Sequence, residues 1–157
     1  MPRVLGLDFG TKRIGAALSD PRGMIASPLE VYERHSLKRD EQHYRELVAN
    51  EAVERIVVGL PLHTRGTEGD LAKLCRNFGA WIGEVTGRLV VFQDERYTSR
   101  EAEETMRSAG LKSRDRKARR DMLAAQILLQ AYLDAGCPLI EAVASPLEDP
   151  VLETRDS

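Results

Sequence analysis

Two short apolar runs, Ile56–Leu60 and Leu89–Phe92, limit the folds open to this chain more than any other feature. Continuous apolar runs of this kind are typical of strands that are buried on both faces of a sheet. Between the runs, apolar side chains recur at helical spacing, at Leu71, Leu74, Phe78, Ile82 and Val85. We therefore expect a right-handed strand, helix, strand unit whose two strands are central or parallel, which predicts an α/β fold.

The residues before this unit predict antiparallel pairing. Val4–Phe9 and Ile14–Ser19 are predicted strands, and the short connection Gly10–Arg13 is of the kind that closes a hairpin. Ile25–Val31 is a predicted third strand. We thus expect a mixed five-stranded sheet that begins with an antiparallel hairpin and is flanked by helices.

Helices are expected in three further places. The first begins at Ser36 or Asp40. Capping-box spacing predicts a short second helix over 98–110, and Met122–Leu133 is the most apolar helical segment, which must pack on the sheet. The basic segment between these two is interpreted as a flexible loop.

One domain accounts for the 157 residues. We assign residues 1–140 to it and residues 141–157 to an acidic, partly irregular tail with five acids and one Arg. The chain shows neither a signal-peptide pattern nor an apolar run long enough to span a bilayer, so we expect a cytoplasmic protein without a membrane partner. Cys75 and Cys137 are interpreted as packing residues.

The formal net charge of −2 hides an uneven distribution. Lys112–Arg120 contains six basic residues and one acid. Local charge of this density is compatible with contacts to the phosphates of a nucleic acid, because affinity depends on the local field. A charge run of this kind is also typical of a solvated loop, and the run alone does not decide between the two.

Three carboxylates stand where they could carry out chemistry. Asp8 lies inside the first predicted strand, and Glu95 follows the apolar run Leu89–Phe92 at the carboxyl end of a strand. Asp121 lies near the start of the last helix, on the face that continues with two alanines and Leu128. Its carboxylate is therefore expected to point toward the sheet.

Each carboxylate also has a structural interpretation. Asp8 has Lys12 and Arg13 as neighbouring cations with which it could form a salt bridge. Glu95 is followed directly by an arginine. An acid near a helix start, such as Asp121, interacts favourably with the helix dipole.

Taken together, the three carboxylates form an oxygen ligand set that suits Mg²⁺ or Mn²⁺. Two such ions can activate a water molecule and stabilise the leaving oxygen of a phosphodiester. Basic and hydroxyl side chains would then contact the phosphates of a bound nucleic acid. These are Lys12, Arg13, Arg96, Thr98, Ser99, Arg114, Arg116, Lys117, Arg119 and Arg120.

Four motifs resemble the YqgF family, also called RuvX or Holliday-junction-resolvase-like proteins and regarded as nucleases of precursor 16S ribosomal RNA. They are GLDFGTKRIG at 6–15, VGLPL at 58–62 with Gly66-x-x-Gly69, DERYTS at 94–99, and DMLAAQILLQ at 121–130. The resemblance implies an RNase H-like fold, an acidic triad for Mg²⁺ or Mn²⁺ at Asp8, Glu95 and Asp121, and a cytoplasmic location. One departure is His63, which stands where the family usually has Asn.

Other functions compete with a nuclease. The Asp8–Thr11 segment also resembles the first phosphate loop of sugar kinases and actin-like ATPases, but those enzymes need two such domains. A non-catalytic nucleic-acid-binding module acting in transcription or RNA processing is the second alternative. The sequence does not separate a four-way DNA junction from precursor ribosomal RNA as substrate; two symmetric nicks in a junction would need a homodimer, whereas trimming RNA would not.

Overall fold

The computed structural model describes residues 2–61, 68–94 and 113–139, with only the backbone described over 113–119. Its strands form one five-stranded sheet in the order β3-β2-β1-β4-β5. The strands are β1 (Arg3–Asp8), β2 (Arg13–Ser19), β3 (Ala26–Glu33), β4 (Val53–Leu60) and β5 (Leu89–Asp94). Strand β2 is antiparallel to both of its neighbours, whereas β1, β4 and β5 run parallel. The predicted mixed sheet with an initial hairpin is confirmed.

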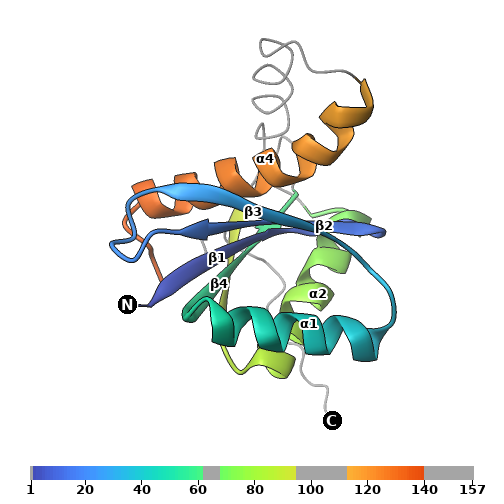
Figure 1. Ribbon diagram of the computed structural model, residues 1–157, viewed down its shortest axis with the longest axis horizontal. Helices are drawn as coiled ribbons and strands as arrows, with labels where there is room; N and C mark the ends of the chain where they lie inside the picture. The colour runs from blue at the N-terminus through green and yellow to red at the C-terminus, as the bar shows by residue number, and fades with distance from the viewer. Residues whose placement is uncertain (1, 62–67, 95–112, 140–157) are drawn as a thin grey trace.

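Helices cover both faces of this sheet (Figure 1). Helices α1 (Leu37–Asn50) and α2 (Asp70–Thr86) pack on one face, and α4 (Ser113–Asp134) crosses the other, over β1, β2 and β3. Each face of the sheet therefore has its own apolar packing, because successive residues of a strand point to opposite faces. In β4, for example, Ile56 and Val58 belong to the cluster under α1 and α2, whereas Val57 belongs to the cluster under α4.

Strand β4 is buried on both faces as predicted, but β5 is not a central strand. It lies at the edge of the described sheet, and the side chain of Leu89 is 52% exposed. An apolar run of four residues does not distinguish a central parallel strand from a parallel edge strand that a helix covers on one face. The prediction that the strand is central or parallel is confirmed by its parallel pairing with β4, and the prediction of burial on both faces is wrong for β5.

Ser36 is the N-cap of helix α1, because its hydroxyl accepts a hydrogen bond from the Arg39 amide. This confirms one of the two predicted starts. Helix α2 is rotated from the predicted orientation, because Leu71 and Leu74 are 49% and 44% exposed. The buried face instead runs through the small residues Ala72, Cys75 and Gly79, as well as larger ones. A Cβ atom on Gly79 would collide with the Phe92 ring, so the small residues let α2 lie close to β5.

The prediction of a flexible basic loop is wrong over most of its length, because α4 is already helical at Ser113. Arginine, lysine and alanine are good helix formers, so a dense run of basic residues does not by itself oppose a helix. The segment over 113–120 therefore continues directly into the predicted helix Met122–Leu133. Cys75 lies in the core and Cys137 packs against the cluster under α4, as expected for packing residues.

Helix α4 approaches the sheet so closely that glycine is required beneath it. A Cβ atom on Gly15 of β2 would collide with the backbone carbonyl of Asp121. A Cβ atom on Gly6 of β1 would lie 2.8 Å from the Cβ of Leu129. Because these two glycines have no side chain, the backbone of α4 can lie directly against β1 and β2.

Several expectations fall outside the described residues. They are the helix over 98–110, the loop that contains His63, and the acidic tail over 141–157. In the described part of the chain, no helix combines the length and the apolar character needed to cross a membrane.

Candidate active site

Asp8 is the last residue of β1 and faces α4. It pairs with Gly15 across the β1–β2 ladder, and paired residues of neighbouring strands point to the same face. The Cα–Cβ direction of Gly15 leads to Asp121 of α4, and that of Gly6, two residues before Asp8, leads to Leu129. Both observations place the Asp8 carboxylate on the α4 face at the carboxyl end of β1.

Asp121 lies on the other side of the same glycine. The backbone of Asp121 is the part of α4 that contacts Gly15, and the side chains one turn further on, Ala124 and Ala125, are buried. Asp121 and Ala125 are one helical turn apart, which covers about 5.4 Å, and Gly6 and Asp8 are two strand residues apart, which cover about 6.6 Å. Because these lengths are similar and Ala125 lies above Gly6, Asp121 lies above the end of β1. The structure therefore brings Asp8 and Asp121, far apart in sequence, to one place.

The structure changes the alternative interpretations of these two acids, a salt bridge for Asp8 and a helix-dipole interaction for Asp121. Arg13 Nε donates a 3.1 Å hydrogen bond to Asp121 Oδ2, so the expected partner of Asp8 forms an ion pair with Asp121 instead. Asp121 also stands eight residues after the first residue of α4. The helix dipole acts within the first turn, so it does not account for an acid at this position, and that alternative is wrong.

Strand register extends the site toward β5. Leu7 pairs with Val58 and Gly59 pairs with Gln93, so Asp8, Gly59 and Gln93 lie side by side across three strands. Val91 packs in the cluster under α4, and Gln93, two residues later, points to the same face. Gly59 has no side chain, so no side chain of β4 stands between Asp8 and Gln93.

Gln93 contributes an unusual oxygen to this face. Its Oε1 atom is buried and has no hydrogen-bond partner among the described residues. A buried acceptor without a partner costs free energy and is rare in folded proteins. Sequence reasoning missed Gln93 because a neutral amide carries no charge that needs explanation, although its two-residue spacing from Glu95 could have drawn attention to it.

Glu95 itself lies outside the described residues. Asp94, however, is the last residue of β5 and is described. Phe92 lies against Gly79 of α2, so Asp94, two residues later, belongs to the α2 face. Asp94 thus points away from the face of Asp8.

The expected phosphate contacts are described only in part. Lys12 is exposed in the loop after β1, Arg13 is held by Asp121, and the Arg120 side chain is half-buried beside the site. Arg96, Thr98 and Ser99, and the side chains of Arg114, Arg116, Lys117 and Arg119, lie outside the described set. Within residues 2–61, 68–94 and 120–139, no three acidic, His or Cys side chains are grouped for a metal ion. Of the three predicted ligands, Asp8 and Asp121 lie on the same face of the described structure.

Solved structures of similar fold define the class of fold. The chain superimposes on Thermus thermophilus RuvC in complex with a Holliday junction substrate with a TM-score of 0.56, at 15% identity, over 87% of this chain and 97% of that chain. It matches Fowlpox virus resolvase, in complex with Holliday junction DNA, with a TM-score of 0.55 at 9% identity, over 87% of this chain and 99% of that one. The protein has the RNase H-like fold of these resolvases.

Sequence comparison gives the family. The family model described as "RuvX: Holliday junction resolvase" matches residues 2–135. A relative from Rhodopirellula baltica is 40% identical over 147 residues, which are 94% of this chain and 85% of the relative. A relative from Syntrophomonas wolfei is 42% identical over 134 residues, 85% of this chain and 95% of the relative. Both relatives bear the name "Putative pre-16S rRNA nuclease". The chain belongs to the RuvX family.

Proposed function

We propose that this protein is a divalent-metal-dependent nuclease whose metal ligands are Asp8, Glu95 and Asp121. The observation that carries the proposal is the placement of Asp8 and Asp121 on either side of Gly15, on one face of the sheet. A carboxylate at the end of a half-buried strand is a suitable ligand for a hard cation. Glu95 follows Gln93 by two residues, so continued alternation would bring its carboxylate to the same face.

The residues present fit Mg²⁺ or Mn²⁺. The described donors are oxygen atoms, and the buried Gln93 Oε1 adds an acceptor that no described protein group satisfies. When bound, divalent ions of this kind lower the pKa of a coordinated water and neutralise charge on a phosphodiester. Nothing in the described donor set favours a metal that prefers sulfur or imidazole ligands.

The cations of the site have two roles in this proposal. Arg13 neutralises Asp121 and holds its carboxylate in place from β2. Lys12 and the basic part of α4 flank the acidic end of β1 and would bind phosphates on either side of the scissile bond. Since phosphate contacts carry no sequence information, we expect recognition of nucleic-acid shape.

Precursor 16S ribosomal RNA is the substrate that we propose, because relatives about 40% identical over most of the chain carry that name. A four-way DNA junction is the second candidate, since the matching family model is described as a Holliday junction resolvase. Either reaction would take place in the cytoplasm, where we place the protein. Retention of both described acids favours catalysis over a purely binding module in transcription.

The test is cleavage by the purified chain and by Asp8→Asn. Matched substrates, a precursor ribosomal RNA fragment and a four-way DNA junction, are incubated with Mg²⁺, Mn²⁺ or EDTA. We expect metal-dependent cleavage by the unchanged chain and a loss of at least about a thousandfold in Asp8→Asn, with nucleic-acid affinity retained. The matched control is Glu54→Gln, an exposed acid on β4 at the opposite end of the sheet, which should cleave normally.

Metal binding is measured separately from cleavage. Mn²⁺ should raise the melting temperature of the unchanged chain and of Glu54→Gln, because a ligand that binds only the folded state stabilises it. The shift should be reduced in Asp8→Asn. Equal cleavage by Asp8→Asn and the unchanged chain would refute the assignment. The mass in solution, measured beside cleavage, shows whether two symmetric nicks come from a homodimer.

A further inference from the structure

Two neighbouring pockets open at the same end of the sheet as Asp8, on the face opposite α4. The first, of about 310 Å³, is lined by Phe9, Thr11, Arg34, Leu37, Leu74, Asn77, Phe78 and Trp81. The second, of about 400 Å³, is lined mostly by polar and charged residues and shares Thr11, Arg34 and Leu37 with the first. The two form one groove with an apolar half and a polar half. Volumes of this size are typical of sites for small organic groups.

The apolar half is built on packed aromatic rings, of which Phe78 is buried and Phe9 and Trp81 are half-buried. The Phe9 and Phe78 rings lie with their centroids 4.9 Å apart, and Phe78 and Trp81 follow at 5.9 Å. The Arg34 guanidinium carbon lies 5.1 Å from the Phe9 ring centroid. Aromatic rings and a planar guanidinium are the groups on which nucleobases stack.

Exposed apolar side chains complete this half. Leu37 at the start of α1 is 65% exposed and Leu74 of α2 is 44% exposed. Water contacts both leucines in the free protein, so a ligand that covered them would gain free energy from burial. Neither leucine is needed to fill the core between the helices and the sheet.

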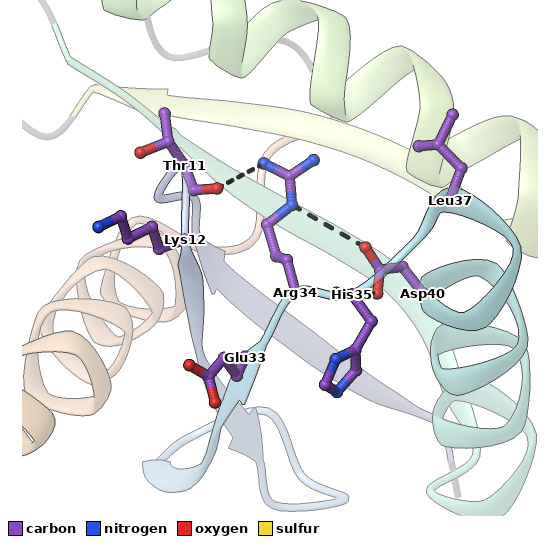
Figure 2. Close-up of a pocket in the computed structure, with 7 residues that line it drawn as sticks. All are labelled: Thr11, Lys12, Glu33, Arg34, His35, Leu37 and Asp40. Carbon is purple, nitrogen blue, oxygen red and sulfur yellow. Dashed lines mark hydrogen bonds and ion pairs between the residues drawn. The ribbon is translucent and has the colours of Figure 1, made fainter.

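Two cations and two acids line the polar half (Figure 2). Arg34 donates a 3.1 Å hydrogen bond to the backbone carbonyl of Thr11 and lies 4.0 Å from Asp40, and Lys12 extends outward from the same loop as Thr11. Glu33 points away from the Arg34 guanidinium in this view. The groove therefore combines apolar walls with the exposed cation of Lys12 at its opening.

The buried acid of the polar half, Asp40, already has hydrogen-bond donors within the protein. Asp40 accepts hydrogen bonds from the Tyr32 hydroxyl at 2.7 Å and from the His35 amide at 3.0 Å, and Arg34 lies 4.0 Å away. Burial and this hydrogen bond raise the pKa of Tyr32 to about 12, so its hydroxyl remains a donor to Asp40 at neutral pH. Asp40 thus anchors the floor of the pocket and is held among donors of the protein itself.

The groove is continuous with the candidate active site along the chain. Asp8 ends β1, and the next residues, Phe9 and Thr11, line the apolar pocket. Asp8 faces α4 and Phe9 the opposite side, because side chains alternate. A nucleic-acid strand that crosses this end of the sheet can therefore reach both Asp8 and the groove.

We propose that this groove binds an unpaired nucleobase of the nucleic acid whose backbone lies at Asp8, with the base among Arg34, Leu74 and Trp81 and its phosphate near Lys12. The inference rests on the proposed function and deepens it, since it gives the enzyme a means to prefer substrates with unpaired nucleotides beside the cleaved bond. A peptide would use the apolar half, but it would leave Lys12 at the mouth without a phosphate.

Trp81 makes the groove observable, because it is the single tryptophan of the chain. The probes are two hairpins that differ only in a short single-stranded tail, one with bases and one with abasic residues. Titrations in EDTA prevent cleavage. We expect the tail with bases to change the Trp81 emission and to bind at least about fivefold more tightly than the abasic tail. No emission change and equal affinities would overturn the proposal.

A pair of leucine variants gives the control. Leu74→Glu places a negative charge in the groove, whereas Leu71→Glu places one on the same helix, at a residue that is 49% exposed and is not among those lining either pocket. Both should melt like the unchanged chain, because both side chains are exposed. Leu74→Glu should abolish the preference for the tail with bases, and Leu71→Glu should keep it. Equal behaviour of the two variants would overturn the proposal.

The outcomes distinguish this proposal from the proposed function. Metal-dependent cleavage without a preference for unpaired bases would leave the nuclease assignment standing and remove the base site. A base preference without any cleavage would keep the groove as a binding site and remove the catalytic assignment. Binding of neither hairpin would remove both, and equal binding of an apolar peptide to the groove would replace the base by a peptide.

Discussion

The buried amide oxygen of Gln93 has no hydrogen-bond partner in the part of the chain that the structure describes. An acceptor removed from water without a replacement hydrogen bond costs about 1–3 kcal/mol. A protein tolerates such a cost most readily where the group serves binding or chemistry. The position of Gln93 beside Asp8, on the face under α4, indicates that the cost is linked to the candidate active site.

Gln93→Leu should therefore separate stability from activity. We expect the free energy of unfolding to rise by about 1 kcal/mol, because an apolar group of similar size replaces an unsatisfied one. Metal-dependent cleavage should fall, because the site loses an oxygen donor. Chemical denaturation and cleavage assays on the same preparation measure the two effects.

The same substitution at Gln126 is the control. Gln126 Nε2 donates a 3.1 Å hydrogen bond to the Ala26 carbonyl, so Gln126→Leu leaves that acceptor without this donor. It should lower the free energy of unfolding and leave cleavage near normal. A lower stability in Gln93→Leu as well would show that its amide oxygen has a structural partner after all.

Single residues differed in how well the sequence predicted them. Asp8 was identifiable because a carboxylate in an apolar strand is costly, and Asp121 because its helical face continues with small buried residues. The partner of Arg13 was not predictable, since neighbours in sequence suggested Asp8 and the fold supplied Asp121 from 108 positions away. Such a choice depends on where α4 crosses the sheet, which local patterns do not contain.

At the scale of elements, the β1–β2 hairpin supplies both an acid and a cation to the site. The Arg13–Asp121 ion pair links β2 to α4, with the two side chains 32% and 26% exposed. Half-exposed pairs of this kind contribute at most about 1 kcal/mol to stability. The pair therefore matters more for the charge of the site than for the fold.

Arg13→Gln should change metal and nucleic-acid binding in opposite directions. Mn²⁺ should bind more tightly, because Asp121 loses the cation that competes with the metal. Nucleic acid should bind more weakly, and the slope of log affinity against log salt should fall by about 1, because one phosphate contact is lost. Calorimetry with Mn²⁺ in the absence of nucleic acid and a salt series with nucleic acid measure these effects.

Arg3→Gln is the matched control on β1, at the end of the strand away from Asp8. Arg3 forms a comparable 3.5 Å pair with Glu51. Its loss should leave both affinities unchanged. A fall in Mn²⁺ affinity in Arg13→Gln would mean that the arginine organises the carboxylate more than it competes for it.

Helices were predicted less accurately in orientation and length than in existence. In α2, two stripes one residue apart are both apolar, and the choice between them depends on how closely Gly79 allows the helix to approach Phe92. In α4, basic residues were interpreted as a loop although their helix propensity is high. Tertiary contacts decide the orientation of α2, whereas helix propensity alone predicts the helical conformation of the basic residues in α4.

At the scale of the whole molecule, topology was the most predictable property. A hairpin, a third antiparallel strand and two parallel crossovers leave few arrangements, and the observed order β3-β2-β1-β4-β5 is one of them. The division into a domain over 1–140 and an acidic tail remains a prediction, because residues 140–157 lie outside the described part.

Removal of residues 141–157 should test this division. We expect the melting temperature to stay the same, because the domain over 1–140 carries the core. Affinity for nucleic acid should rise at low salt, since five acids and one Arg are removed, and the gain should shrink as salt screens the charges. A neutral tail of the same length should give the same gain. A large fall in melting temperature would place part of the tail in the fold.

Helix α4 extends without interruption from its basic first turns at Ser113, past Asp121, to Asp134. The contact of the Asp121 backbone with Gly15 lies between these basic turns and the apolar part of the helix. A phosphate that pulls on the first turns therefore loads this contact, which leaves the helix no room to approach the sheet further. The distance of Asp121 from the end of β1 would in this way be set before any substrate binds.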